Sequence, residues 1–165
     1  MAFELSSDIT TATISFQITM NGSDAVVQIP IGFDDELKRN YVLHICMAPF
    51  VGAVQSEFEL TFFISIYDEK MDAFLAPLWC GKELRNFIPE APHIARIRIA
   101  LLTAIEAMIS KLSPQHVRVF TYQANLPKKA LRKFNLIATL FHHKGYRCGE
   151  GDPYHGRRIW MFEKK

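Results

Sequence analysis

The spacing of apolar residues changes near residue 91, and this change limits the folds open to the chain. Before it, residues 57–67 (EFELTFFISIY) alternate so that every second side chain is apolar, as in a strand with one buried face. After it, residues 92–112 carry apolar side chains at steps of three and four, the pattern of an amphipathic helix. Both patterns need a cover for their apolar face, so the sequence predicts helices packed on a sheet.

The N-terminal third predicts a hairpin. Residues 12–20 alternate between apolar and polar side chains, Asn21-Gly22 suits a tight turn, and a second apolar segment starts at Ala25. Pro30 has no backbone N–H to donate to a neighbouring strand, so the second strand is expected to end there or to lie at an edge. Residues 37–48 fit either a short helix or a strand, and the sequence leaves both open.

The C-terminal half alternates helices and strands. The strand predicted for residues 57–67 has Phe63 and Tyr67 on its second face, so a helix is expected to cover that face in part. The following order is a helix (92–112), a strand (116–123), a helix that Asn125 can cap and Gly145 can end, a turn-rich stretch (148–156) and a last strand (157–165). We therefore predict one α/β (α+β) domain over residues 1–165, with a single mixed, largely antiparallel sheet and helices packed on it.

Composition excludes several classes of protein. The 165 residues are 49% hydrophobic and 22% charged, which suits a soluble globular domain. No apolar run approaches the roughly 18 residues that would span a bilayer, and the N-terminus lacks the basic start and apolar stretch of a signal peptide. Three cysteines are too few for a disulfide framework. We expect a cytoplasmic protein that does not contact membranes.

Charge is unevenly distributed along the chain. Residues 1–91 hold 5 Lys/Arg and 13 Asp/Glu, a balance of −8, whereas residues 92–165 hold 14 and 4, a balance of +10. The basic half is expected to meet an anionic partner, such as nucleic acid or an acidic protein. The alternative is that the two halves attract each other within one fold.

The last predicted helix carries a pattern of residues that is found in a known family. Asn135, Ala138, Leu140-Phe141 and Gly145-Tyr146 follow one another on and just after this helix. In this pattern, and in the order of elements from residue 92 to 165, the chain resembles the GNAT superfamily of N-acetyltransferases, with one residue fewer between the Ala and the aromatic position. The resemblance implies a GNAT-like fold and transfer of an acyl group from acetyl-CoA, or another acyl-CoA, to an amine. It also implies that acyl-CoA lies in a splay of the sheet, between the helix from Pro92 and the strand 116–123.

Two positions depart from the family pattern. The acyl-CoA loop of the family contains glycine, whose exposed N–H groups hold the pyrophosphate at a helix N-terminus, but residues 85–98 (RNFIPEAPHIARIR) contain none. The tyrosine that often protonates the departing thiolate is Phe141 here. As replacements we consider His142 or His143 as a general base and Tyr146 as the acid, with Tyr154 as a further hydroxyl. The alternative is that both histidines only end a helix and that Tyr146 packs in the core.

Six residues are candidates for binding the cofactor: Arg96, Arg98, Asn125, Lys128, Lys129 and Arg132. Arg98 falls within the apolar arc of its helix and needs an anionic partner, either a phosphate or a carboxylate from the acidic half. Arg96 lies on the opposite side of that helix, so the two arginines cannot face one ligand together. Lys128, Lys129, Arg132 and Lys133 crowd a helix start, where each cation opposes the helix dipole by about 0.3–1 kcal/mol. Such a group suits a CoA phosphate, nucleic acid or an acidic protein; the alternative is a solvated basic surface.

No metal site is predicted. His142, His143, Cys148, Asp152 and His155 lie within 14 residues, but their spacing matches no standard zinc ligand pair. Residues 79–82 (WCGK) could line the mouth of a pocket, although a single cysteine beside a tryptophan is more typical of a core.

Two functions without catalysis compete with the acyltransferase hypothesis. One is a GNAT-like module that binds nucleic acid or an acidic protein through its basic C-terminal surface. The other is a structural or regulatory protein that forms a homodimer through a strand edge.

Overall fold

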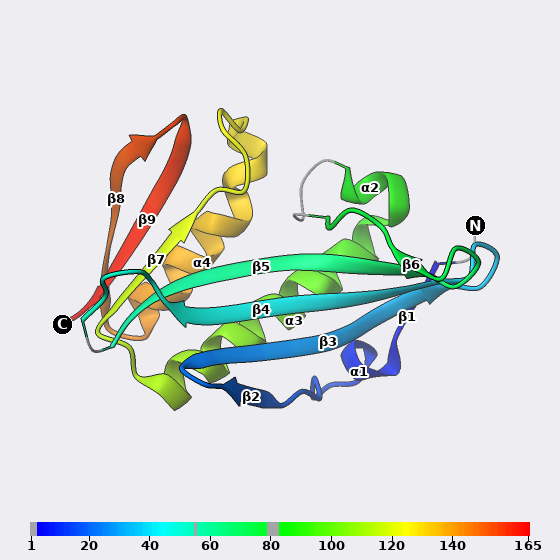
Figure 1. Ribbon diagram of the computed structural model, residues 1–165, viewed down its shortest axis with the longest axis horizontal. Helices are drawn as coiled ribbons and strands as arrows, with labels where there is room; N and C mark the ends of the chain where they lie inside the picture. Colours follow the sequence, from blue (N-terminus) through cyan, green and yellow to red (C-terminus); the bar gives the residue numbers. More distant parts are fainter. Residues whose placement is uncertain (1–2, 55, 79–82) are drawn as a thin grey trace. The chain divides into compact units, whose positions relative to one another are not determined.

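The computed structural model describes residues 3–54, 56–78 and 83–165, and within them nine strands form one sheet with helices packed on it (Figure 1). The strands are β1 (Phe3–Leu5), β2 (Ile18–Asn21), β3 (Asp24–Asp34), β4 (Arg39–Pro49), β5 (Glu57–Asp68), β6 (Ala73–Phe74), β7 (His116–Phe120), β8 (Tyr146–Tyr154) and β9 (Arg157–Lys164). The helices are α1 (Ser7–Thr10), α2 (Leu84–Phe87), α3 (Ala91–Leu112) and α4 (Arg132–His143), and a 3-10 turn, η1 (Lys128–Leu131), precedes α4.

The sheet has the order β1-β3-β4-β5-β7-β9-β8, with β2 beside β3 and β6 beside β5. It is largely antiparallel, but β5 and β7 run parallel and pair Glu57 with His116, Phe58 with Val117 and Glu59 with Arg118. Helix α3 connects these two strands, as a parallel connection requires. The predicted class, a single mixed sheet with helices packed on it, is confirmed.

The chain forms two compact units. The first unit contains the described residues of Met1–Thr19, Val26–Ile45 and Phe62–Ala104, and the second unit those of Met20–Ala25, Cys46–Thr61 and Ile105–Lys165. Strands β3, β4 and β5 and helix α3 each contribute residues to both units. That the chain is one domain stays a prediction.

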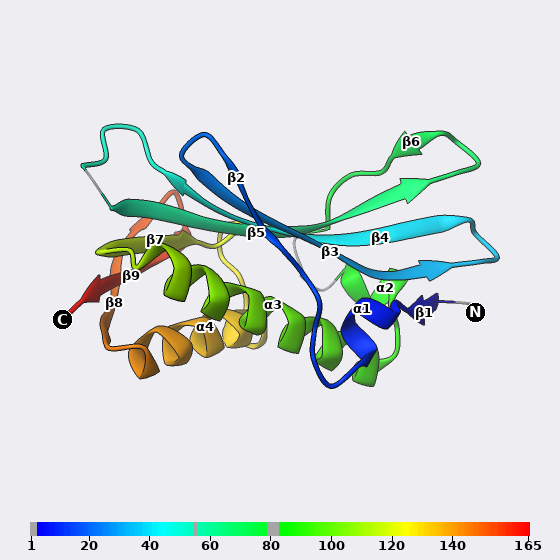
Figure 2. The same cartoon turned by 90° about the horizontal axis from the view of Figure 1, so that it is seen from below.

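The core of the first unit lies on one face of β3, β4 and β5. Alternate residues of these strands, such as Ile29, Leu43 and Ile64, are fully buried, and Ile97 and Leu101 of α3 are buried with them. Figure 2 shows α1 and the first turns of α3 on the same face of β3 and β4.

Glycine is required where β1 meets β3. A Cβ atom on Gly32 would collide with the Glu4 carbonyl oxygen and the Phe3 ring. Gly32 therefore permits the close approach that pairs Leu5 with it in the antiparallel ladder.

The core of the second unit lies between α4 and the strands β7, β9 and β8 (Figures 1 and 2). Phe134 stacks on Trp160 with ring centroids 4.8 Å apart, and Phe141 stacks on Phe162 at 4.1 Å. The predicted buried stripe of this helix is confirmed at Phe134, Ile137 and Phe141.

Most predicted elements are confirmed, including the strand over residues 57–67, the helix over 92–112 and the hairpin turn at Gly22, whose φ is +61°. Within residues 37–48, residues 39–48 belong to β4, which settles the choice in favour of a strand. On the second face of β5, side chains of neighbouring strands contact the two aromatic residues: Phe63 stacks on His44 of β4, and Tyr67 contacts Phe74 of β6.

Four predictions about local structure are wrong. Residues 12–17 are not strand, because the Ser15 N–H donates to the Asp8 carbonyl rather than to a neighbouring strand. Strand β3 does not end at Pro30 but continues to Asp34, so of the two alternatives for Pro30 the strand end is wrong. Asn125 does not cap the last helix, which starts at Arg132 after η1. The stretch 148–156 is not a run of turns, since most of it forms β8.

Strand β8 tolerates its glycines and its proline because it is the last strand in the sheet order and pairs only with β9. A register shift between Gly151 and Tyr154 accommodates Pro153 as a bulge.

Replacing Asp68 with Asn is expected to lower the free energy of unfolding at neutral pH. The buried Asp68 carboxylate accepts a hydrogen bond from Arg39 Nε at 2.9 Å, and the backbone N–H groups of Lys70 and Met71 donate to it as well. The hydrogen bond from Arg39 lowers the pKa of Asp68 below 3.8. Its stabilisation is therefore present above that value and is lost as the pH falls through the folded-state pKa.

Urea unfolding of wild type and Asp68→Asn at neutral and acidic pH checks this. The difference in free energy of unfolding between the two proteins should be largest near pH 7 and should become smaller as the pH falls. Asp152→Asn, at an exposed carboxylate without an ion pair in the described structure, is the control. A difference in free energy of unfolding that does not change with pH would contradict the prediction.

Candidate functional site

The loop that follows β7 packs against the start of β9 in the second unit. The Thr121 N–H donates to the Arg158 carbonyl at 3.0 Å, the Arg158 N–H donates to Thr121 Oγ1 at 3.0 Å, and the Asn125 N–H donates to the Gly156 carbonyl at 2.9 Å. Gly156 has a φ of +75°, and a Cβ atom there would lie 3.0 Å from Asn125 Oδ1. A glycine at this turn therefore lets the loop approach the β8–β9 hairpin closely.

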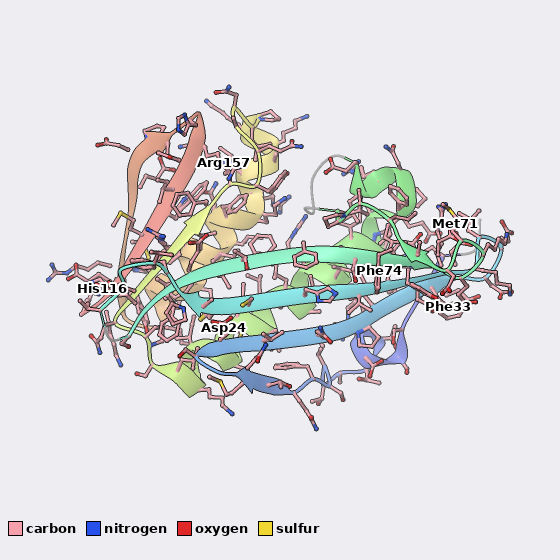
Figure 3. The ribbon with its side chains drawn as sticks, in the orientation of Figure 1. Asp24, Phe33, Met71, Phe74, His116 and Arg157 are labelled. Carbon is pink, nitrogen blue, oxygen red and sulfur yellow. The ribbon has the colours of Figure 1, made fainter. Side chains whose placement is uncertain are left out.

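This contact brings cations from two segments to one end of the second unit. Lys128, Lys129 and Arg132 follow the loop, and Arg157 follows Gly156; all four are exposed. Figure 3 shows Arg157 between the start of β9 and the loop that precedes η1. Among the described residues none of the four forms an ion pair. We call these four residues the basic end.

Two further cations nearby already have partners. Arg158 Nη2 donates to both oxygens of the Glu150 carboxylate, at 2.7 and 2.8 Å. Lys133 is buried, donates to the Tyr122 hydroxyl at 3.3 Å and lies 4.5 Å from the centre of that ring. Lys133 therefore does not join the basic end, although the sequence grouped it with Lys128, Lys129 and Arg132.

The predicted catalytic residues lie away from the basic end. His142 and His143 are exposed in the last turn of α4. His142 follows Arg132 by ten residues, or about 15 Å along a helix. Tyr146 is buried and donates its hydroxyl proton to the Pro114 carbonyl at 2.6 Å, and burial raises the pKa of Tyr146. The structure thus does not bring these three side chains together with the predicted anion ligands.

The predicted cofactor ligands are divided between the two units. Arg96 and Arg98 belong to the first unit, whereas Asn125, Lys128, Lys129 and Arg132 belong to the second. Arg96 donates to the carbonyls of Ile9 and Thr11, which lie at the end of α1, where carbonyl groups lack helical partners. Arg98 is half-buried, and among the described residues it forms no ion pair, so the predicted carboxylate partner is not found.

Among the described residues, three ion pairs link the oppositely charged halves of the sequence. Arg118 lies 3.3 Å from Glu59, and His116, labelled in Figure 3, lies 3.7 Å from Glu57. His93 lies 3.5 Å from Glu90. Many other carboxylates lie in the turns of the first unit, where Phe33, Met71 and Phe74 are also exposed (Figure 3). The basic end is therefore not neutralised by the ion pairs that join the two halves.

Phe141 is completely buried between the Phe162 and Tyr146 rings. Residues 79–82, proposed as the mouth of a pocket, lie outside the described residues. Cys46 and Cys148 are free thiols, and no three potential metal ligands gather within residues 3–54, 56–78 and 83–165.

The sequence analysis missed a row of polar side chains in the first unit. Gln28, His44 and Ser65 come from three neighbouring strands and form hydrogen bonds across them. Only the register between the strands brings them together, so no local sequence pattern could have identified them.

No helix in the described parts of the chain is both long and apolar enough to cross a membrane. No family model, curated protein or solved structure matches the chain.

Replacing Tyr146 with Phe is expected to lower the free energy of unfolding by about 1 kcal/mol or more, because the buried Pro114 carbonyl loses its hydrogen-bond donor. Urea unfolding measures the loss. Tyr154→Phe is the control, because Tyr154 is 60% exposed and should tolerate the change. Equal stability of wild type and Tyr146→Phe would contradict the structural role of this hydroxyl.

Proposed function

We propose that the chain binds acyl-CoA and transfers its acyl group to an amine, as the resemblance to the GNAT superfamily implies. The observation that carries this proposal is the parallel pairing of β5 with β7 in an otherwise largely antiparallel sheet, with α3 as the connection. The resemblance places acyl-CoA at a splay of the sheet. A parallel ladder that ends after three residue pairs, while β7 continues beside β9 to Phe120, is compatible with such a splay.

The basic end supplies a site for the phosphates of the cofactor. Lys128, Lys129, Arg132 and Arg157 offer N–H donors that form charge-assisted hydrogen bonds with phosphate oxygens. Their mutual repulsion and the unfavourable placement of cations at the start of α4 both decrease when an anion binds. In the family, N–H groups of a glycine-containing loop hold the pyrophosphate, and residues 85–98 contain no glycine. The four cations of the basic end would hold the phosphates in place of such a loop.

Positioning is the main catalytic contribution in this proposal. The neutral amine attacks the thioester carbonyl, a C–N bond forms, the C–S bond breaks, and the amine proton passes through solvent to the departing thiolate. Holding the two reactants together supplies the rate enhancement. The roles assigned to His142, His143 and Tyr146 stay predictions, and this mechanism does not depend on them.

Acetyl-CoA and CoA are expected to raise the melting temperature of the protein saturably. A ligand that binds only the folded state adds about 2.7 kcal/mol at a hundredfold excess over Kd. The triple variant Lys128→Gln, Lys129→Gln, Arg132→Gln should lose most of this shift, and the shift for wild type should decrease with added salt. Differential scanning fluorimetry at two salt concentrations measures both effects.

The matched control changes three exposed cations elsewhere in the second unit, Lys111→Gln, Arg147→Gln and Lys165→Gln, so that net charge falls equally. It should retain the shift. No response to either CoA species, or equal loss in both triple variants, would contradict the proposal.

A second candidate function uses the same basic end to bind nucleic acid. The unpaired cations favour it, as does Tyr154, an aromatic side chain that is 60% exposed and contacts His155 beside Arg157. Duplex and single-stranded DNA belong in the same titration. A salt-sensitive shift with DNA and none with CoA would favour this function over acyl transfer.

A further inference from the structure

A row of three polar side chains crosses the first unit on the face of the sheet opposite its core. Gln28 of β3, His44 of β4 and Ser65 of β5 each alternate with fully buried neighbours, so all three point to the same outer face. His44 Nε2 lies 2.7 Å from Ser65 Oγ, and His44 Nδ1 lies 3.4 Å from the amide nitrogen, Nε2, of Gln28.

The imidazole of His44 is held in place by Gln28 on one side, by Ser65 on the other and by the ring of Phe63. It stacks on Phe63 with centroids 4.7 Å apart and planes 5° from parallel. Strand pairing fixes the backbone on both sides, so the contact between His44 and Ser65 does not depend on a flexible loop.

This arrangement has the parts of an activated nucleophile. A hydroxyl lies within hydrogen-bond distance of an imidazole nitrogen, and the second nitrogen faces a group that can fix the ring orientation. Burial lowers the pKa of His44, which keeps the imidazole neutral near pH 7 and able to accept a proton.

We propose that Ser65 is a nucleophile that accepts an acyl group from a small activated ester or thioester, with His44 as its general base. In the step, the bond from Ser65 Oγ to the acyl carbon forms and the bond from that carbon to the leaving group breaks. The Ser65 proton passes to His44 Nε2 and then to the departing thiolate or aryloxide. This site is distinct from the basic end and does not rest on the proposed binding of acyl-CoA.

The surroundings define the class of substrate. Side chains of the neighbouring rows on this face include Val26, Val42 and Phe63, all half-buried, which suits a short acyl or aryl group without charge. Strands β3, β4 and β5 bond to one another through their backbone N–H groups, which leaves few donors for a developing oxyanion. The leaving group must therefore be a good one, as in an aryl ester or a thioester.

The orientation of the Gln28 amide sets which nitrogen of His44 carries the proton. In the structure its amide nitrogen faces Nδ1, an orientation that leaves the proton on Nε2. Rotation of the amide by 180° brings its oxygen to Nδ1, so that Nδ1 is protonated and Nε2 has the free lone pair that Ser65 needs. A carboxylate at position 28 can only accept, so Gln28→Glu is expected to favour the reactive tautomer and to raise the rate.

The test treats the full chain with p-nitrophenyl acetate in the absence of CoA. A burst of p-nitrophenolate, with acetyl on Ser65 in peptide mass mapping, is the expected result. Ser65→Ala should abolish the acetylation at this peptide, and His44→Asn should slow it by about a hundredfold or more. Gln28→Glu should speed it several-fold, a gain that a merely structural hydrogen bond would not produce.

Two control variants complete the experiment. Thr61→Ala removes another hydroxyl from the same strand, and Cys46→Ala removes the thiol in the row next to His44. Both should leave acetylation of Ser65 unchanged, and the melting temperature of every variant reports whether it is folded. Acetyl found only on lysine or cysteine, or an unchanged Ser65 rate in a folded His44→Asn variant, would overturn the proposal. Because no CoA is present, these outcomes are independent of the proposed function.

Discussion

The second unit depends on the two ring stacks that join α4 to β9. Phe134 on Trp160 and Phe141 on Phe162 fix one helix along two turns of its length against the sheet. Such pairs contribute about 0.5–1.5 kcal/mol each beyond the burial of their area. Because Phe141 is completely enclosed, its ring belongs to the packing of this helix, and a hydroxyl at that position would need a buried partner. The phenyl ring of Phe141 therefore has a structural role.

The same stacks determine where the cations lie. Fixing α4 against β9 fixes its first turn beside the β8–β9 hairpin, and Gly156 lets the preceding loop come close enough for the Asn125–Gly156 hydrogen bond. Lys133 turns inward onto aromatic rings, whereas Lys128, Lys129 and Arg132 stay in solvent. These three positive charges oppose the helix dipole at the start of α4, yet they stay at the surface and are not neutralised. The proposed function uses this surface.

Periodicity predicted the elements whose burial is regular along the chain. The alternation of residues 57–67 and the helical steps of residues 92–112 reflect one continuous buried face, so β5 and α3 were predicted within a residue or two at each end. Strand β8 was missed because an edge strand needs no apolar face, and its glycines and Pro153 have the composition of turns. The start of α4 was missed because Pro127 precedes a 3-10 turn rather than the first turn of the helix. Cross-strand contacts depend on register, and the hairpin lengths that set register cannot be read from any one segment.

The environment of each histidine determines the chemistry available to it. His116 lies between two carboxylates, Glu57 at 3.7 Å and Glu163 at 3.6 Å. The row of His44 contains an alcohol, an amide and a phenyl ring instead, so no carboxylate stabilises a proton on it. A protonated imidazole cannot act as a base, and the burial that lowers the pKa of His44 is therefore what leaves it available to Ser65. In a chain whose first half carries 13 acidic residues, a neutral row at the centre of a sheet face is a specific chemical environment.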